Sequence, residues 1–135
     1  MASEKKMHVP SGFLFAACSA GLRKHGSGPD VALMYSTVPA ASAAVFTTNK
    51  VKAAPVLLSQ QRIRKSTFAQ LILVNAGNAN CATRNGEKVA NNTTKALAKL
   101  LKLPPAQVLP ASTGVIGVEL DENLILNKLE HLVDN

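Results

Sequence analysis

Residues 69–74, Ala-Gln-Leu-Ile-Leu-Val, are almost entirely apolar and are followed directly by Asn75. A short apolar run that ends at a turn residue is typical of a strand buried inside a sheet. Such a strand needs hydrogen-bonding neighbours and apolar cover, which the remainder of the chain must supply. The fold is therefore expected to be built around a sheet that contains this run.

Apolar segments on both sides of this run predict further strands. Residues 13–20 are apolar on both alternating sets, which is typical of a strand covered on two faces. Residues 30–37 and 43–48 indicate two more strands, separated by a turn around Pro39, and residues 107–111 indicate a short strand later in the chain. Three consecutive strands near the N-terminus favour an antiparallel meander.

Three segments predict helices. Pro55 suits the first turn of a helix that continues to about Lys65, with Val56 and Ile63 on its inner face. Residues 87–101 form an amphipathic pattern, and Asp121 is expected to cap a last helix. The inner faces of these two later helices are expected to use Val89, Thr93, Ala96, Leu97 and Leu100, and Ile125, Leu129, Leu132 and Val133, respectively.

The order of these elements indicates the fold class. A chain of 135 residues with 47% apolar content has the size of one domain, here residues 1–135, and enough apolar side chains for one core. A strand meander with helices inserted later predicts an α+β fold, a mixed and largely antiparallel sheet sandwich with helices on its outer faces. No glycine-rich nucleotide-binding motif follows a predicted strand, so we expect no cofactor.

The formal net charge of +7 raises nucleic acid as a partner, but the distribution of the charges argues against it. Residues 1–102 hold 14 of the 15 basic residues and residues 103–135 hold five of the eight acidic ones, yet no basic run exceeds two residues. This pattern favours solvated surface charge. No apolar run approaches the roughly 18 residues of a membrane-spanning helix, so we expect neither a nucleic-acid nor a membrane partner.

Cysteines and histidines are sparse and scattered. Cys18 and Cys81 lie 63 residues apart and are expected to be reduced, buried thiols rather than part of a zinc site or a disulfide framework. We assign no chemistry to His8, His25 and His131, and we expect no metal. The N-terminus resembles a secretory signal, but Glu4 and Pro10 interrupt it, so a cytosolic protein with a loose tail at residues 1–6 is expected.

Residues 111–117, Ala-Ser-Thr-Gly-Val-Ile-Gly, lie between a predicted strand and a predicted helix. The Thr113 hydroxyl and the Gly114 backbone N–H are adjacent hydrogen-bond donors, and Gly114 has no side chain to obstruct a close approach. Such a pair can form an oxyanion hole, which stabilises the negative charge that a carbonyl oxygen gains during acyl transfer. Ser-Thr-Gly is also a common turn composition, so these residues alone leave ordinary turn chemistry open.

Asn75, Asn78 and Asn80 alternate with small residues directly after the apolar run. Asparagine side chains support left-handed turn geometry through bonds to nearby backbone groups. They can equally hold a substrate or position the neighbouring Ser-Thr-Gly turn. The residues leave these alternatives open.

Four motifs occur in order along nearly the whole chain. They are Ser-Gly-Phe at 11–13, Val-Phe-Thr-Thr-Asn at 45–49 followed by Ala-Ala-Pro-Val at 53–56, Val-Asn-Ala-Gly-Asn-Ala-Asn at 74–80, and Ser-Thr-Gly-Val-Ile-Gly at 112–117. Together they resemble the ornithine acetyltransferase family, the bifunctional glutamate N-acetyltransferases of arginine biosynthesis. In that family a precursor cuts itself into an α and a β chain, and this sequence is similar to the N-terminal part of α.

The resemblance implies an acetyltransferase that moves acetyl from N-acetylornithine to glutamate through a ping-pong acyl-enzyme mechanism. It implies that Thr113 and Gly114 form the oxyanion hole, and that the N-terminal threonine of a β chain is the nucleophile. The implied assembly is an α2β2 heterotetramer in the cytoplasm. The chain departs from the family at residues 81–86, where a Cys-Thr-Gly is usual, and it stops at Asn135, short of the usual cleavage site.

Two other functions remain as alternatives. The chain can be a non-catalytic subunit that packs against other chains, or a basic binding domain. A partner that supplies an N-terminal threonine favours the acetyltransferase, whereas binding to nucleic acid with a steep salt dependence favours the basic domain.

Overall fold

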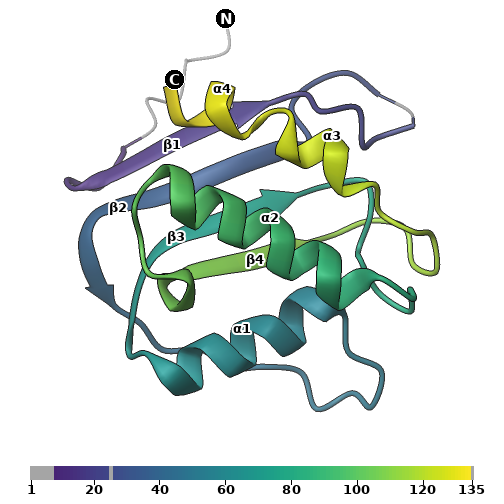
Figure 1. Ribbon diagram of the computed structural model, residues 1–135, viewed down its shortest axis with the longest axis horizontal. Helices are drawn as coiled ribbons and strands as arrows, with labels where there is room; N and C mark the ends of the chain where they lie inside the picture. The colour runs from purple at the N-terminus through teal and green to yellow at the C-terminus, as the bar shows by residue number, and fades with distance from the viewer. Residues whose placement is uncertain (1–7, 25, 135) are drawn as a thin grey trace, which may run out of the picture.

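A computed structural model describes residues 8–24 and 26–134 (Figure 1). The expected tail at residues 1–6 and His25 lie outside the described residues. Four strands form one sheet in the order β1-β2-β3-β4. They are β1 (Phe13–Cys18), β2 (Val31–Ala41), β3 (Phe68–Asn75) and β4 (Val108–Ser112).

The pairing of the strands confirms the predicted class of sheet. β1, β2 and β3 form an antiparallel meander, whereas β4 runs parallel to β3. The apolar run at residues 69–74 lies within β3, an inner strand between β2 and β4. The fold is therefore α+β with a mixed, largely antiparallel sheet, as the sequence predicted.

The α-helices lie on one side of the sheet and along one of its edges. They are α1 (Ala54–Lys65), α2 (Gly86–Leu100), α3 (Glu122–Leu126) and α4 (Leu129–Asp134), and a 3-10 turn at Pro105–Gln107 precedes β4. In Figure 1, α2 crosses in front of the sheet, α1 runs along the outer edge of β4, and α3 and α4 lie near β1 and β2.

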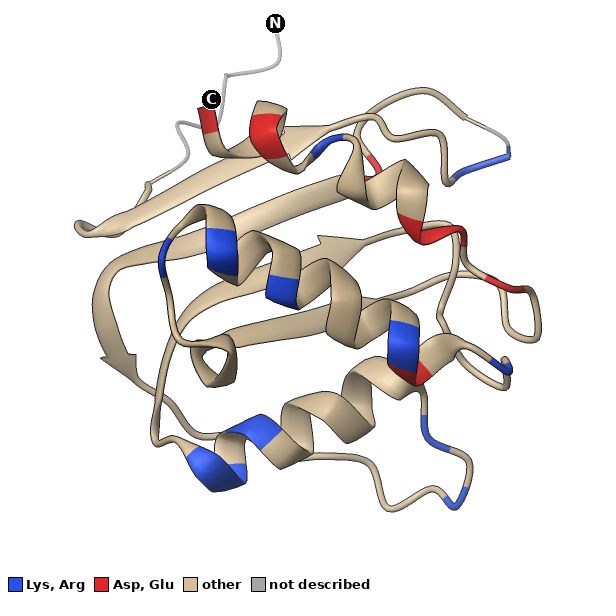
Figure 2. Ribbon diagram, viewed as in Figure 1, with Lys and Arg blue, Asp and Glu red and all other residues tan. Residues whose placement is uncertain are grey.

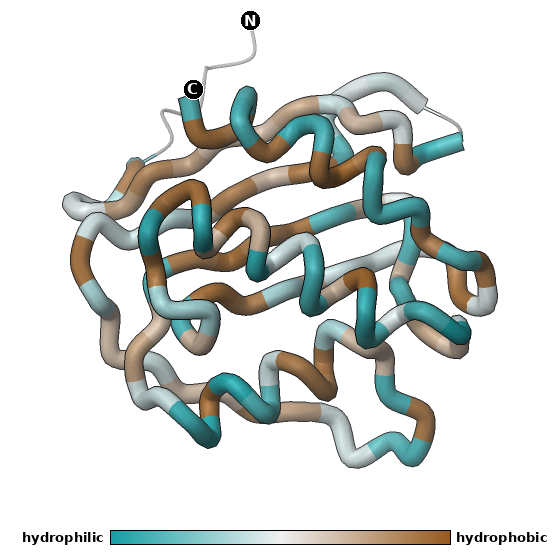
Figure 3. Tube along the Cα trace, viewed as in Figure 1, coloured by the Kyte–Doolittle hydropathy of each residue, from teal (hydrophilic) through white to brown (hydrophobic). Residues whose placement is uncertain are grey.

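The core lies between this face of the sheet and the helices. Two cross-strand rows point toward the helices and contribute most of the buried side chains of the sheet. Leu71 and Val108 of the first row and Leu97 of α2 are at most 1% exposed. Figure 3 shows hydrophobic residues concentrated along the strands. The rows are Leu14–Tyr35–Leu71–Val108 and Ala16–Leu33–Leu73–Pro110.

The opposite face of the sheet, here called the open face, has no layer over it among the described residues. It is apolar, and Phe15 and Met34 remain 45% and 39% exposed. The second sheet of the predicted sandwich is thus not seen within residues 8–24 and 26–134, and β1 is covered on one face rather than on two. Two cross-strand rows make up the open face: Phe15–Met34–Ile72–Leu109 and Ala17–Ala32–Val74–Ala111.

The prediction of a strand at residues 43–48 is wrong. This segment belongs to no strand, and Val45 is 100% exposed. β2 instead continues to Ala41 through a register shift, and β3 occupies the position beside it. We attribute the position of β3 beside β2 to the burial of apolar side chains, since Leu71 and Leu73 of β3 lie in the core and are 1% and 3% exposed.

The α1 helix begins within one residue of its predicted start, but its predicted inner face is wrong. Val56 and Ile63 are only half-buried, whereas Ser59 and Arg62 are 8% and 5% exposed. β4 lies at the edge of the sheet, so its outward carbonyl groups need donors from elsewhere. Polar side chains of α1 meet this need, which local apolar spacing does not reveal.

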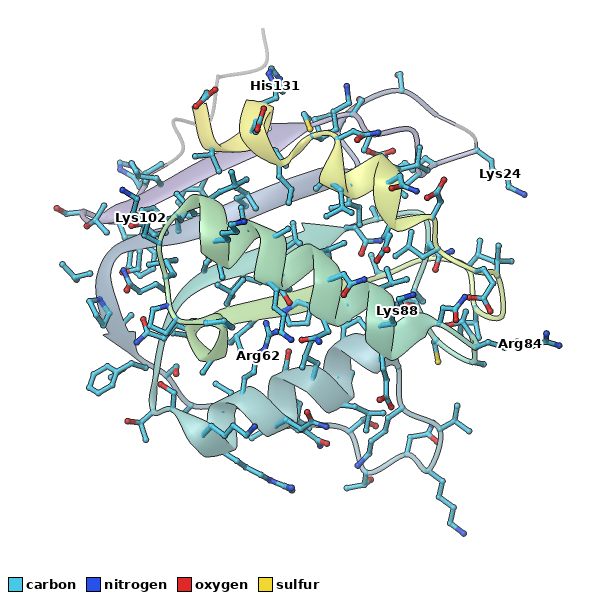
Figure 4. All side chains as sticks on the ribbon, viewed as in Figure 1. Lys24, Arg62, Arg84, Lys88, Lys102 and His131 are labelled. Carbon is cyan, nitrogen blue, oxygen red and sulfur yellow. The ribbon has the colours of Figure 1, made fainter. Side chains whose placement is uncertain are left out.

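Two side chains of α1 bind the edge of β4. The Ser59 hydroxyl donates to the Pro110 carbonyl at 3.1 Å, and Arg62 Nη1 donates to the Val108 carbonyl. Arg62 Nη2 also donates to Asn91 of α2 at 3.3 Å. Figure 4 shows Arg62 directed from α1 toward this interior. Burial lowers the pKa of Arg62, but a guanidinium remains protonated in proteins.

The later helices follow the prediction in part. Val89, Thr93 and Leu97 of α2 are buried and Ala96 is half-buried, whereas Leu100 is 42% exposed. The single last helix proves to be the two short helices α3 and α4. Asp121 caps α3 as expected, accepting the Asn123 N–H at 3.0 Å. Ile125, Leu129 and Leu132 are buried, and Val133 is half-buried.

Both cysteines are free and buried, as predicted. Burial raises the pKa of the Cys18 thiol, the charge of Lys128 opposes this rise, and the charge of Asp30 adds to it. A thiol with a raised pKa is a weak nucleophile at neutral pH, so Cys18 has the character of a structural residue.

Candidate active site

Several chain segments meet at one end of the sheet. β1, β3 and β4 end there and β2 begins there, because β1 and β3 are antiparallel to β2 and β4 is parallel to β3. The segments that follow β1, β3 and β4 therefore lie side by side at the right-hand end of the sheet in Figure 1. Hydrogen bonds link Ala76 to Asp30 and Ala79 to Val115 across these segments.

The Ser-Thr-Gly turn leaves the sheet at the end of β4. Thr113 N–H donates to the Asn75 carbonyl at 3.0 Å, and Val115 N–H donates to the Gly77 carbonyl at 3.3 Å. Between them, the Gly114 N–H and the Thr113 hydroxyl have no hydrogen-bond partner within the described ranges. Thr113 and Gly114 are exposed. Two adjacent donors are thus available to an anion; their role as an oxyanion hole stays a prediction.

Two glycines bring three backbone segments into close contact, here called the glycine stack: residues 20–23, Gly77 and Gly114. Gly114 has φ +132°, and a Cβ atom there would lie 2.3 Å from the Gly77 carbonyl carbon. Gly77 has φ +94°, and a Cβ atom there would lie 2.7 Å from the Leu22 carbonyl oxygen. Only glycine fits at these two positions, because a side chain would overlap backbone atoms that have no space to move.

Asn75 connects the end of β3 to the turn. Its side-chain Oδ1 accepts the Ser112 hydroxyl at 2.5 Å, its Nδ2 donates to the Asn78 carbonyl at 2.9 Å, and its own carbonyl accepts the Thr113 N–H. Asn75 is 4% exposed. Of the alternatives left open for this loop, the contacts of Asn75 favour positioning of the neighbouring turn.

Asn78 and Asn80 are also buried and bound to the chain. Asn78 accepts the Asn80 N–H at 2.8 Å and donates to the Val118 carbonyl at 3.0 Å. Asn80 donates to the Gly86 carbonyl at 2.9 Å and has φ +47°, the left-handed geometry that asparagine tolerates. Both side chains therefore fix loop geometry, and neither amide is directed to an external ligand.

Asp30 is a site residue that the sequence did not single out. Asp30 is 5% exposed, and its carboxylate accepts the backbone N–H groups of Ala20, Leu22 and Arg23 at 2.6, 2.7 and 3.1 Å. Burial alone would raise the pKa of Asp30, but the hydrogen bonds from the 20–23 backbone outweigh burial and hold the pKa below its usual value. The only signal in the sequence is one acid between Gly28-Pro29 and an apolar strand.

A cleft of about 570 Å³ opens beside the glycine stack. Gly77, Asn78 and Val115 line it, and its charged lining combines Arg23 and Lys24 with acidic residues of the segment before α3. Figure 2 shows the wider pattern, with Lys and Arg along α1 and α2 and most acidic residues in the C-terminal segment. Figure 4 shows Lys24 directed outward at this end of the molecule.

One acid beside the cleft already has a structural role. Glu119 accepts the N–H groups of Arg84 and Asn85 at 2.7 and 3.4 Å, directly before α2. A carboxylate at this position complements the positive end of the helix dipole.

The described residues contain no group of three or more His, Cys, Asp and Glu side chains that could hold a metal ion. Of the helices in this part of the chain, none combines the length and the apolar character that crossing a membrane requires.

Comparison with known proteins identifies the family. Residues 14–135 match the model of the ArgJ family. The chain belongs to the ArgJ family. The resemblance that its four motifs indicated is thereby confirmed.

Named relatives of this ArgJ-family chain include enzymes of arginine biosynthesis. The arginine biosynthesis bifunctional protein ArgJ of Nitratidesulfovibrio vulgaris is 44% identical over 112 residues, which cover 82% of this chain and 28% of the relative. The glutamate N-acetyltransferase of Methanococcus maripaludis is 44% identical over 113 residues, which cover 84% of this chain and 27% of the relative. The chain thus spans less than a third of the length of these curated relatives.

Solved structures of the ArgJ family share the fold. Ornithine acetyltransferase of Mycobacterium tuberculosis, complexed with ornithine, is 34% identical with a TM-score of 0.85, covering 93% of this chain and 67% of that chain. The ArgJ protein of Bacillus halodurans is 34% identical with a TM-score of 0.83, covering 88% of this chain and 62% of that chain.

Proposed function

We propose that this chain supplies the oxyanion hole of an acetyltransferase that moves acetyl from N-acetylornithine to glutamate in arginine biosynthesis. The turn at Thr113 and Gly114 carries the proposal, because it presents two adjacent unpaired donors from a backbone that the glycine stack holds in place. Donors that are already oriented need no reorganisation when charge develops on a substrate oxygen. Membership of the ArgJ family supports the assignment to acetyl transfer.

In the proposed first half-reaction, the hydroxyl of an N-terminal threonine on a β chain attacks the acetyl carbon of N-acetylornithine. The acetyl oxygen becomes negatively charged in the tetrahedral intermediate, where the Thr113 hydroxyl and the Gly114 N–H donate to it. The C–N bond then breaks, the ornithine amine leaves with the proton that the threonine gave up, and acetyl remains on threonine as an ester.

In the second half-reaction, the α-amine of glutamate attacks the ester carbon. The same two donors stabilise the second tetrahedral intermediate. The C–O bond to threonine breaks, a proton passes from the amine to the threonine oxygen, and N-acetylglutamate leaves. The chain itself provides charge stabilisation in both halves and no covalent step.

The lengths of the relatives support a partner chain. The chain covers 62% of the solved Bacillus halodurans chain but only 28% of the curated Nitratidesulfovibrio vulgaris relative, as expected when a longer precursor yields two polypeptides. We include a β chain, an α2β2 heterotetramer and a cytoplasmic location in the proposal. The ornithine bound to the Mycobacterium tuberculosis relative supports ornithine as the product of the first half-reaction.

Thr113→Val in the enzyme assembled from this chain and its β partner tests the proposal. Valine keeps the β-branched shape and removes only the donor, so kcat should fall by about 10² to 10³, as for the loss of one oxyanion donor elsewhere. KM should change little, because the bond strengthens as charge develops, so kcat and kcat/KM fall together. Thr48→Val, at an exposed threonine outside the site, is the matched control.

The outcomes separate the proposal from ordinary turn chemistry. A folded Thr113→Val enzyme with kcat within about twofold of the Thr48→Val control would show that the turn is structural only. The isolated 135-residue chain should not turn over N-acetylornithine, because in the proposed scheme the threonine that accepts the acetyl group belongs to the β chain. Turnover by the pure chain, free of a second polypeptide, would contradict the partner requirement.

A further inference from the structure

We propose that Asp30 is a positioning residue for the Thr113–Gly114 donor pair, acting through residues 20–23 and Gly77. The inference rests on the proposed function of that pair. Asp30 lies outside the turn and contacts no donor directly, so its effect must pass through the glycine stack.

The first link is the carboxylate itself. Oδ1 of Asp30 accepts the Ala20 N–H, and Oδ2 accepts the N–H groups of both Leu22 and Arg23. An ionised carboxylate is an acceptor only, and charge-assisted bonds of this kind are about twice as strong as neutral ones. One side chain therefore sets the path of the 20–23 backbone.

The second link joins residues 20–23 to Gly77. The Leu22 carbonyl lies so close to the Gly77 α-carbon that an added Cβ would be 2.7 Å from its oxygen and 2.9 Å from its carbon. The Asp30 carbonyl also accepts the Ala76 N–H at 2.8 Å. Asp30 thus holds residues 20–23, which pack against Gly77, and it also binds Ala76, which precedes Gly77. A shift of residues 20–23 or of Ala76 therefore moves Gly77.

The third link joins Gly77 to the donors. Gly77 packs against Gly114, and the Gly77 carbonyl accepts the Val115 N–H at 3.3 Å. Val115 directly follows Gly114, whose free N–H must point at the substrate oxygen in the proposed mechanism. Displacement of Gly77 therefore rotates or shifts the Gly114 donor, and misplacement by about 1 Å can cost about 10² in rate.

Asp30→Asn in the assembled enzyme is the test. Asparagine has nearly the same shape, but it keeps only one acceptor oxygen, so its amide nitrogen must face either the Ala20 N–H or the Leu22 and Arg23 N–H groups without accepting them. The matched control is Glu122→Gln, which alters another acidic residue that accepts N–H donors, here from the Asn92 side-chain amide of α2, and which is not among the residues that line the cleft. Kinetics should be normalised to the active sites counted by the burst of acetylation, so that partial unfolding does not lower kcat.

The expected result is a fall in kcat per active site of about tenfold or more for Asp30→Asn, with KM within about threefold and little change in kcat for Glu122→Gln. In addition, Asp30→Asn should lower kcat much less in a Thr113→Val background than in the parent, because both changes act on one donor pair. A role confined to stability would reduce the number of active sites and the Tm while leaving kcat per site unchanged, and that result would overturn the inference.

The test also separates this inference from the proposed function. If Thr113→Val lowers kcat and Asp30→Asn does not, only the inference about Asp30 fails. If Thr113→Val leaves kcat unchanged, the oxyanion hole itself fails, and the positioning role fails with it.

Amide hydrogen exchange in the unmutated assembled enzyme decides the case if Asp30→Asn does not fold. The N–H groups of Leu22 and Val115 should show similar protection factors, because both are released only when the glycine stack opens as one unit. Val115 exchanging more than about tenfold faster than Leu22 would show that the turn moves independently of the segment that Asp30 holds, and would overturn the inference.

Discussion

Replacing Gly114 by alanine perturbs the candidate oxyanion hole without removing a hydrogen-bond donor. The added Cβ atom would lie 2.3 Å from the Gly77 carbonyl carbon, 2.5 Å from the Asn78 nitrogen and 2.6 Å from the Gly77 oxygen. All three atoms belong to backbone that neighbouring hydrogen bonds hold, so no flexible side chain can move aside. The turn at residues 113–115 must therefore shift away from Gly77.

The size of the shift follows from these distances. Non-bonded carbon atoms pack at about 3.5 to 4.0 Å, so relief of a 2.3 Å contact requires a displacement of at least roughly 1 Å. A displacement of that size at a catalytic donor predicts a loss of about 10² in kcat. Alanine at φ +132° is strained by about 1–3 kcal/mol, and overpacking costs about another 1–3 kcal/mol. The unfolding free energy should fall by the sum of these two costs.

Gly117→Ala is the matched control for backbone strain. Gly117 has φ +80°, but nothing lies within 4 Å of an added Cβ atom, so alanine there should cost only about 1–2 kcal/mol. The assay compares kcat per acetylated active site and the unfolding free energy of the variants, both measured in the assembled enzyme. If Gly114→Ala matched Gly117→Ala within about twofold in kcat, close packing on Gly77 would have no part in placing the donor.

Three further predictions concern stability and association. Ser59→Ala should lower the unfolding free energy by about 1–3 kcal/mol in denaturant titrations, because a buried β4 carbonyl loses its donor, whereas Ser42→Ala, which removes a solvent-exposed hydroxyl bond to the Thr67 carbonyl, should stay within about 0.5 kcal/mol. The isolated chain should self-associate through the open face in sedimentation experiments, and Met34→Lys should reduce association more than Val45→Lys. Because folding lowers the pKa of Asp30, its contribution to stability should be complete above about pH 4 to 5 and lost as pH falls through the folded pKa; Asp30→Asn should remove this part of the acid dependence in pH-dependent melts.

The sequence predicted those elements whose burial follows a local period. The run at residues 69–74 became β3, and the 3.6-residue stripe around Val89, Thr93 and Leu97 became the buried side of α2. The segment at 43–48 has a similar apolar content but lies outside the sheet, because position beside β2 is decided by competition between segments far apart in the chain. Local pattern does not report the outcome of that competition.

The candidate donors were predictable because their chemistry lies within two adjacent residues. A hydroxyl next to a glycine is visible at Thr113 and Gly114 in the sequence itself. The supports of the turn were less visible. Gly77 is one glycine among eight, and its requirement arises from contacts with Leu22 and Gly114, 55 and 37 residues away. The three asparagines of this loop stand out in the sequence, but the groups to which they bind do not.

One physical cause explains why both Asp30 and Arg62 escaped prediction. Each is a charged residue in a buried position where sequence reasoning looks for an oppositely charged partner. Asp30 is instead satisfied by backbone N–H groups, and Arg62 by a backbone carbonyl and an amide. Every residue except proline carries a backbone N–H and a backbone carbonyl. When a side chain binds such a group, the residue type of its partner therefore gives no sign of the interaction in the sequence. A buried charge without a visible counter-charge is therefore a reason to search for an unpaired backbone segment, such as the edge of β4 or the loop at residues 20–23.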